Sequence, residues 1–385
     1  MDRHYVMDRL AKYFHVVWMH QPDWRECLAG LKSNGNGIES LSAPRRESLH
    51  VYPPEYWLPR LGRPAWLGNF TLRQRLKHAR EMLRAQGCTK VVLYIWRPEF
   101  AEALEQLPHD FSVYHVNDEY TFSSTEMAVP ARERQLLESV NQVILTSPAL
   151  MEKRGGFNRN TEFVPMGVDY RLYATPTPEP EDLHSISHPR IGYVGYLKAQ
   201  LDWPLLLELS ALHSEWSFVF VGPKRSHPKM YDAIEQMSRR PNVYFLGGRP
   251  TEQLGGYAQH FDACIMPYCL DDYTKYVYPL KLHEYLATGQ PVVSSRMHSV
   301  EEFEGVVAIG DTQEQWSDLI KHSLSERENS PERRAQRQAV AREFDWDILV
   351  QKIVRPIAAH FDMQIPDLAP ISEPQSSSTL SVPLV

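Results

Sequence analysis

The segment 278–294 contains the residues whose types and spacing best suit chemistry. Lys281 and Glu284 lie three residues apart, so in a helix they share one face. A helix N-terminus attracts phosphate through its free N–H groups, and a lysine there adds a mobile positive charge. A carboxylate one turn further on can accept hydrogen bonds from both hydroxyls of a ribose. The same spacing also fits a surface ion pair, which would contribute only about 0.2–0.5 kcal/mol.

The sequence also predicts where this helix begins and ends. Pro279 fits the first turn of a helix, where the missing N–H costs nothing. Gly289 fits the left-handed position that ends a helix, and Pro291 prevents its continuation. We therefore expect a short helix that packs against the strand after it.

A second group of candidates lies at the ends of predicted strands in the first half of the chain. His20 ends one apolar run, and His115 and Asp118 lie at the end of another. Ligands of open α/β sheets sit beyond the carboxyl ends of the strands, so these groups could orient or deprotonate a hydroxyl. The alternatives are a solvated turn at Asp118 and a core residue at His115. Their spacing matches no metal-ligand motif, so we expect no metal site.

Apolar runs alternate with helical stretches and predict an α/β fold with parallel strands. The expected strands are 14–20, 90–96, 111–116, 142–146, 190–195, 217–221, 242–246, 263–266, 291–294 and 306–309. Further helices are expected at 70–86, 98–107, 131–140, 205–212 and 346–360. This alternation predicts two Rossmann-like domains facing across a cleft. The expected parts are an acceptor domain (1–172), a proline-rich linker (173–189), a nucleotide domain (190–345), a helix crossing back (346–361) and a disordered tail (362–385).

Composition excludes several protein classes. The 385 residues include 41 Lys+Arg and 48 Asp+Glu, a formal net charge of −7, which argues against nucleic-acid binding. There is no long apolar run and no signal-type N-terminus, and the four cysteines form no disulfide framework, so we expect a cytoplasmic protein. The charge is uneven: residues through Asp169 carry a net +1 and the remainder −8.

The pattern Pro279-Leu280-Lys281-x-x-Glu284-Tyr285-x-Ala287-x-Gly289 resembles the donor-binding motif of glycosyltransferase family four, whose fold is called GT-B. The turn 163–169 and the strand ends near Gly222, Gly247 and Pro267 follow in the family's order. The likeness covers residues 130–350 and is strongest over 240–295.

This resemblance implies transfer of a sugar from a nucleotide diphosphate sugar, with retention of configuration and without a metal or other cofactor. By position, Glu284 would bind the ribose, while Lys281 and the N–H groups of 280–282 would hold the diphosphate. The candidate donor-binding residues are Gly195, Tyr196, Lys198, Gly222, Arg249, Pro267, Tyr276, Leu280, Lys281, Leu282 and Glu284.

Three positions depart from the family pattern. Tyr196 and Asp202 stand where the family usually has an arginine and a lysine, and Tyr276 replaces an acidic residue. We expect Lys281, with Lys198, Arg249 or Lys275, to supply the missing positive charge. The Leu201-Asp202 form of this loop resembles a subgroup that includes teichuronic-acid-type bacterial polysaccharide transferases.

The stretch 71–84 predicts a helix with a basic stripe. Arg73, Lys77, Arg80 and Arg84 share one side, and Leu72, Leu76, Ala79 and Leu83 share another. Such a helix can lie against an anionic membrane, although a core-facing helix with a charged outer face has the same pattern.

The expected function is therefore glycosyl transfer to a glycan or lipid-linked acceptor, in the cytoplasm or at the inner face of the membrane. One alternative is a nucleotide-sugar epimerase of the same fold, which would depend more on His20, His115 and Asp118. The other is a non-catalytic nucleotide-sugar-binding partner protein.

Overall fold

A computed structural model describes residues 2–19, 46–52, 58, 65–120, 127–225 and 227–366 of the chain. The chain forms two compact units. The first unit combines residues up to Pro165 with a segment that begins at Trp346, and the second comprises Met166–Asp345. His20 lies outside the described residues.

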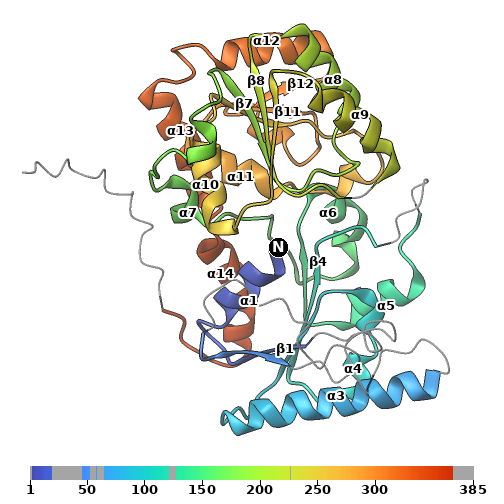
Figure 1. Cartoon of the computed structure of the whole chain (residues 1–385). Coiled ribbons are helices and arrows are strands. Elements are labelled where there is room, and N and C mark those ends of the chain that lie inside the picture. The colour runs from blue at the N-terminus through green and yellow to red at the C-terminus, as the bar shows by residue number, and fades with distance from the viewer. Residues whose placement is uncertain are drawn as a thin grey trace, which may run out of the picture. The chain divides into compact units, whose positions relative to one another are not determined.

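The first unit contains a parallel four-stranded sheet (Figure 1). Its order is β3 (Val92–Ile95), β4 (Phe111–Val116), β5 (Gln142–Leu145) and β6 (Thr161–Phe163). All six residues of β4 are buried, as expected for a strand covered on both faces. Strands β1 (Val16–Met19) and β2 (Leu49–Tyr52) form a separate parallel pair.

The helices of the first unit come from both ends of the chain. They are α1 (Asp2–Leu10), α3 (Ala65–Ala85), α4 (Ala103–Gln106), α5 (Ala131–Ser139), α6 (Pro148–Arg154) and α14 (Trp346–His360). Buried apolar residues recur along α14 at helical spacing, including Leu349, Ile353 and Ile357. The indole ring of its first residue, Trp346, stacks on Tyr5 with ring centroids 5.8 Å apart.

The helix expected at 98–107 is wrong in its extent. A single 3-10 turn covers Pro98–Phe100, and α4 follows with only four residues. Pro108 accounts for the end of α4, because the residue before a proline prefers an extended backbone and Leu107 has φ −106° and ψ 113°. The interruption between Phe100 and Ala103 is the part that the prediction missed.

The second unit contains a parallel six-stranded sheet. Its order is β12 (Ala308–Gly310), β11 (Val292–Ser295), β10 (Ala263–Met266), β7 (Arg190–Val194), β8 (Ser217–Val221) and β9 (Val243–Gly247). Strand order runs outward in both directions from the neighbours β7 and β10. In such sheets, ligands bind beyond the carboxyl ends of the strands at this switch point.

Helices flank this sheet in two groups (Figure 1). One group contains α8 (Trp203–Leu212), α9 (Pro228–Ser238) and α12 (Gln313–Ser323). The other contains α7 (Tyr170–Ala174), α10 (Thr251–Gln259), α11 (Leu280–Thr288) and α13 (Pro331–Glu343). The start of α11 after Pro279 and its end at Gly289, whose φ is 79°, are as predicted.

The proline-rich stretch 173–189 lies within the second unit. Leu183 and Ile186 are buried, and the Arg190 guanidinium donates hydrogen bonds to both of their carbonyl oxygens, at 2.7 and 2.9 Å. Two apolar side chains thus anchor a segment whose prolines indicated a linker.

Among the helices that the structure describes, none combines the length and the apolar character needed to span a membrane.

Candidate functional site

Three glycines bring the ends of adjacent strands together in the second unit. The N–H of Gly195 donates to the carbonyl of Val221 at 2.7 Å, and the N–H of Gly222 donates to Gly247 at 2.8 Å. Gly195 and Gly222 have φ values of 142° and 151°, which disfavour other residues. A Cβ on Gly222 would overlap the backbone of Gly195, so a glycine is required for this approach.

Lys281 lies directly over the loop that follows β7. A Cβ on Gly195 would overlap the end of the Lys281 side chain, and its ammonium lies 5.2 Å from the centre of the Tyr193 ring. Pro279 precedes α11 without a capping side-chain hydrogen bond. The N-terminus of α11 therefore places a lysine and helix N–H groups beside Gly195, which has no side chain, an arrangement suited to phosphate.

Glu284 lies one turn further along α11 and is partly buried. Burial raises the pKa of its carboxyl, while the charge of Lys281 and a hydrogen bond from Tyr173 lower it. Tyr173 belongs to α7, which follows the predicted turn at 163–169. Sequence analysis missed this tyrosine because only the fold brings α7 against α11.

Buried tyrosines fix α11 in place. The hydroxyl of Tyr285 accepts a hydrogen bond from the N–H of Val194 at 2.8 Å, which ties the helix to the end of β7. His283 is bonded to the Tyr278 hydroxyl at 2.8 Å, and its ring stacks on Phe344 with centroids 3.9 Å apart. Burial lowers the pKa of His283 to about 3, so it is neutral near pH 7.

The departures from the family pattern have a structural explanation. Asp202 accepts a hydrogen bond from the N–H of Leu205 at 3.0 Å and so caps α8. Tyr196 is 44% exposed, and the guanidinium of Arg225 lies 4.8 Å from its ring centre. Arg225 thus brings a cation to the loop from the next strand end, a residue that sequence analysis did not identify. Lys198 lies 5.4 Å from the ring of Tyr268.

Three predicted donor-binding residues, Tyr276, Pro267 and Leu282, are buried or already hydrogen-bonded within the protein. Tyr276 is only 4% exposed, and the carbonyl of Pro267 accepts the N–H of Asp202 at 2.7 Å. The N–H of Leu282 donates to Pro279 at 3.1 Å, and its side chain is buried. Because that N–H is occupied, the helix N–H groups available to an anion narrow to Leu280 and Lys281.

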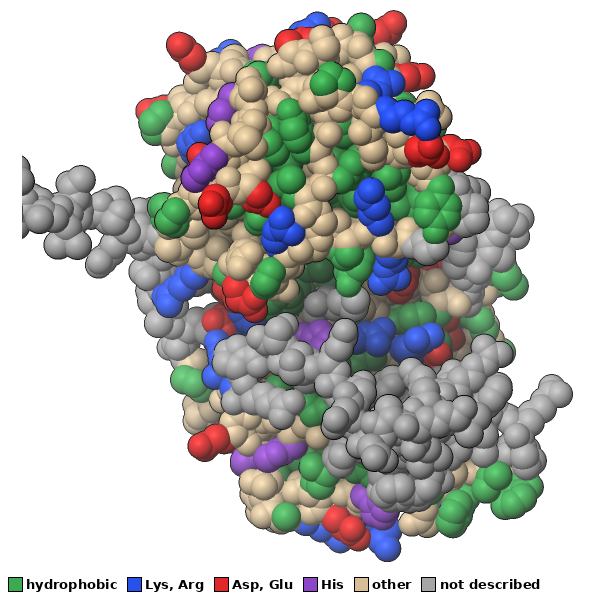
Figure 2. All heavy atoms as spheres, viewed as in Figure 1, with side chains coloured by type: hydrophobic (Ala, Val, Ile, Leu, Met, Phe, Trp, Pro, Cys, Tyr) green, Lys and Arg blue, Asp and Glu red, His purple; other side chains and the backbone are tan. Residues whose placement is uncertain are grey.

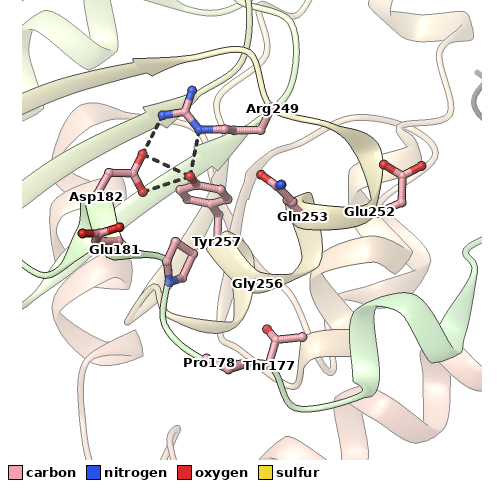
Figure 3. Close-up of a pocket in the computed structure, with 10 residues that line it drawn as sticks. Thr177, Pro178, Glu181, Asp182, Arg249, Glu252, Gln253, Gly256 and Tyr257 are labelled. Carbon is pink, nitrogen blue, oxygen red and sulfur yellow. Dashed lines mark hydrogen bonds and ion pairs between the residues drawn. The ribbon is translucent and has the colours of Figure 1, made fainter.

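Arg249 does not serve as a spare cation for the site, contrary to our expectation. Its guanidinium donates to the Asp182 carboxylate at 2.6 Å and to the Tyr257 hydroxyl at 2.8 Å (Figure 3). Tyr257 in turn donates to Asp182 at 2.9 Å. These residues line a pocket of about 700 Å³ together with Glu181 and Glu252, so carboxylates offset the charge of the arginine.

The predicted catalytic role of His115, in the first unit, is wrong. His115 is 2% exposed, its Nδ1 is bonded to the Tyr94 hydroxyl at 2.7 Å, and its ring stacks on Trp96 at 4.1 Å. Burial, together with the charge of Arg3, lowers the pKa of His115 to about 3. A histidine with this pKa is a weak base near neutral pH, so His115 is a core residue.

Asp118 remains a candidate at the carboxyl end of β4. It is partly exposed, and its carboxylate accepts the N–H of Glu119 at 2.9 Å. Glu119 itself is buried and forms two hydrogen bonds with the Arg154 guanidinium, at 2.7 and 2.8 Å.

Residues 188–326, which hold the glycine loops, Lys281 and Glu284, match the protein family described as "Glycosyl transferases group 1". The likeness to this family is therefore confined to residues 188–326. This segment falls within the second unit and includes every donor-binding candidate named above.

A curated relative resembles this chain over part of its length. The chain is 28% identical over 197 residues to TuaH of Bacillus subtilis (strain 168), a provisionally named teichuronic acid biosynthesis glycosyltransferase. The match covers 49% of this chain and 48% of TuaH, so the chain spans about half the length of the curated relative.

Solved structures confirm the GT-B fold. Anabaena Alr3699/HepE, solved in complex with UDP, has a TM-score of 0.61 at 17% identity, covering 81% of this chain and 86% of its own. WaaG, a glycosyltransferase involved in lipopolysaccharide biosynthesis, has a TM-score of 0.54 at 13% identity, covering 88% of this chain and 96% of its own. At these identities the likeness establishes the fold alone.

Proposed function

We propose that this protein is a glycosyltransferase that moves a sugar from a nucleotide diphosphate sugar to a glycan or lipid-linked acceptor. The observation that carries the proposal is the placement of Lys281 over Gly195 at the N-terminus of α11, with Glu284 one turn away. In this assignment Lys281 and the N–H groups of Leu280 and Lys281 hold the diphosphate, and Glu284 binds the ribose. The Arg225 guanidinium, 4.8 Å from the Tyr196 ring, adds positive charge at the same loop.

We further propose that the reaction retains anomeric configuration and needs no metal, as the family resemblance implies. Leaving-group charge would be balanced by Lys281 and by the positive end of the α11 dipole. Asp118, at the carboxyl end of β4, is our candidate for contact with the acceptor hydroxyl.

We also propose that the protein works in the cytoplasm and that α3 contacts the inner face of the membrane. Leu72 and Leu76 are buried, whereas Trp66 is 70% and Phe70 50% exposed, and Lys77 is exposed. Exposed aromatic and basic side chains along one helix suit the interface of an anionic bilayer.

Thermal unfolding with UDP-, GDP- and dTDP-sugars tests the donor site. A ligand at one hundred times its Kd stabilises the folded protein by about 2.7 kcal/mol. We expect one nucleotide class to raise the melting temperature and Lys281→Ala to remove most of that rise. The control is Lys321→Ala, which changes an exposed lysine on α12. Equal stabilisation of Lys281→Ala and wild type would refute the assigned site.

Product analysis with the stabilising donor then separates the candidate functions. A glycosyltransferase forms a product that depends on an added acceptor extract. An epimerase changes the donor without an acceptor, and a non-catalytic partner protein binds the donor without turnover.

A further inference from the structure

A large cavity in the first unit lies between two strand edges. Within the described residues, β1 pairs only with β2, and β3 pairs only with β4. The remaining edges of β1 and β3 both line a cavity of about 820 Å³. This volume falls in the range of roughly 300–1,000 Å³ that is typical of sites for small molecules.

The walls of this cavity are mainly apolar. They include Met7 and Leu10 of α1, Leu76 of α3, Leu93 of β3 and Ile357 of α14. All four residues of β1, with the sequence Val-Val-Trp-Met, are only partly buried. Parallel strands are usually covered on both faces, and the residues that the structure describes leave β1 only partly covered. A hydrocarbon chain would supply that cover.

The charged groups of the lining are all positive. Arg3, Arg80, Lys90 and Arg97 line the cavity, and no aspartate or glutamate does so among the described residues. Lys90 pairs with Asp110 at 3.0 Å and Arg97 with Glu99 at 2.7 Å, both carboxylates lying outside the lining. Arg3 and Arg80 have no ion pair in the part of the chain that the structure describes. An anionic head group would complement these cations.

One end of the cavity lies at the side of the sheet where ligands bind. The Arg3 guanidinium lies 5.5 Å from the Trp96 ring, and Trp96 and Arg97 directly follow β3. This is the carboxyl end of the sheet, which Asp118 also occupies after β4. An anion bound at Arg3 would therefore have its chain inside the unit and its head group at the candidate acceptor side.

We propose that this cavity binds the single hydrocarbon chain of a lipid phosphate, with the phosphate at Arg3 and the chain between β1 and β3. The assignment of this lipid as the acceptor rests on the proposed glycosyltransferase function, whereas the binding itself does not. A peptide strand would pair with the two edges, but its uncharged backbone would not complement Arg3 and Arg80.

Calorimetric titration of the full chain tests the lipid site. The probes are dodecyl phosphate below its micelle concentration, the uncharged detergent dodecyl maltoside, and inorganic phosphate. We expect one dodecyl phosphate to bind with a negative heat-capacity change, because apolar surface is buried. We expect the uncharged probe to bind at least about tenfold more weakly, since a charge-assisted contact is lost, and inorganic phosphate not to bind.

Matched variants locate the chain and the head group. Ala79→Phe fills the cavity from α3 and should abolish dodecyl phosphate binding, whereas Ala85→Phe, at an exposed position of the same helix, should not. Arg3→Ala should weaken dodecyl phosphate about tenfold and leave dodecyl maltoside unchanged. Arg84→Ala, at an exposed position outside the cavity, should change neither. If Ala79→Phe fails to fold, the comparison of Arg3→Ala with Arg84→Ala still tests the site.

Three results would overturn the proposal: no binding of dodecyl phosphate, unaltered binding by Ala79→Phe, or equal binding of the charged and uncharged probes. Strong hydrogen-exchange protection of both facing strand edges without lipid would also overturn it, because a peptide strand would then fill the gap. A nucleotide-induced thermal shift without lipid binding leaves the proposed function intact. Lipid binding without any nucleotide shift rejects the function and supports the lipid site.

Discussion

Glu284 can accept hydrogen bonds from ligand hydroxyls at both oxygens only while its carboxyl is ionised. Burial raises the pKa of this carboxyl, and the Lys281 charge and the Tyr173 hydroxyl oppose that rise. Donor binding should therefore weaken as pH falls through the pKa of Glu284. The hydrogen bond from Tyr173 therefore shifts this loss of binding to lower pH.

We predict that Tyr173→Phe lowers donor affinity at low pH more than at high pH. Removing the hydroxyl removes a hydrogen bond to the carboxylate, so the pKa of Glu284 rises further and binding is lost at a higher pH. The loss should reach about tenfold well below the pKa of Glu284, as expected for a hydrogen bond to a charged group. Titration calorimetry at several pH values, with the nucleotide sugar that stabilises the protein, measures it. An equal loss at every pH would contradict the role assigned to Tyr173.

We predict that Gly195→Ala abolishes nucleotide binding. The new methyl group would overlap the end of the Lys281 side chain, and its residue would be strained at a φ of 142°. Gly305→Ala is the control, because a Cβ there meets nothing within 4 Å. Thermal shift with the nucleotide measures both variants, and retained binding in Gly195→Ala would show that Lys281 is not needed at that position.

At the scale of elements, a buried charge cluster joins α6 to α5 and to the segment that follows β4. The Arg154 guanidinium is fully buried and bonds to Glu119 and also to Glu133, the latter at 2.9 Å. Both carboxylates are themselves buried. Loss of one member of such a cluster leaves an uncompensated charge in the core.

We predict that Arg154→Met destabilises the first unit by about 3–5 kcal/mol. Arg134→Met, which breaks the exposed pair with Glu138, should cost under about 1 kcal/mol. Urea unfolding followed by a probe in the first unit distinguishes the two variants. Equal midpoints would mean that the cluster contributes nothing to stability.

Two buried histidines predict loss of stability in acid. The pKa of His283 and that of His115 are each lowered to about 3, below the ordinary value of 6.5. The unfolded chain therefore binds more protons between these values, so stability is complete above pH 6.5 and falls toward pH 3. Each histidine should contribute a slope of about 1.4 kcal/mol per pH unit. His283→Gln should reduce this slope in urea unfolding, and His322→Gln, at a 58% exposed side chain, should not.

A helix could be predicted from the sequence where residues at its own ends signal its start and stop. The bounds of α11 could be predicted because Pro279 and Gly289 act within the helix itself. The break at 98–107 and the anchoring of 173–189 depend on the context of each segment, so apolar periodicity alone did not indicate them. Tyr173 and Arg225 could not be predicted, because their partners come from other elements of the fold.

At the scale of the whole molecule, the second half of the chain has a negative net charge, whereas its expected diphosphate site is positively charged. Residues after Asp169 carry a net charge of −8, yet they contain the expected diphosphate site. Figure 2 shows basic, acidic and apolar side chains interspersed over the viewed face of the second unit. Attraction of an anionic donor must therefore come from the local group formed by Lys281, Arg225 and the start of α11.

We predict that donor binding protects amides mainly in the second unit. Hydrogen exchange with and without the nucleotide should slow most in the loop after β7 and in the first turn of α11. Strands β4 and β5 of the first unit provide the internal reference, since they contain none of the donor-binding candidates. Protection confined to β4 and β5 would mean that the nucleotide binds the first unit, and would contradict the assigned site.

The return of α14 to the first unit has a consequence for synthesis of the chain. The first unit is interrupted by Met166–Asp345, and its helix α14 covers the core with residues made only after that interval. At ~5–20 residues per second, a ribosome would need roughly 10–40 s to translate that interval and reach Trp346. The second unit can thus complete its fold during translation, while the first waits with apolar surface uncovered. A nascent chain stalled before Trp346 should engage chaperones through its earlier, not its later, half.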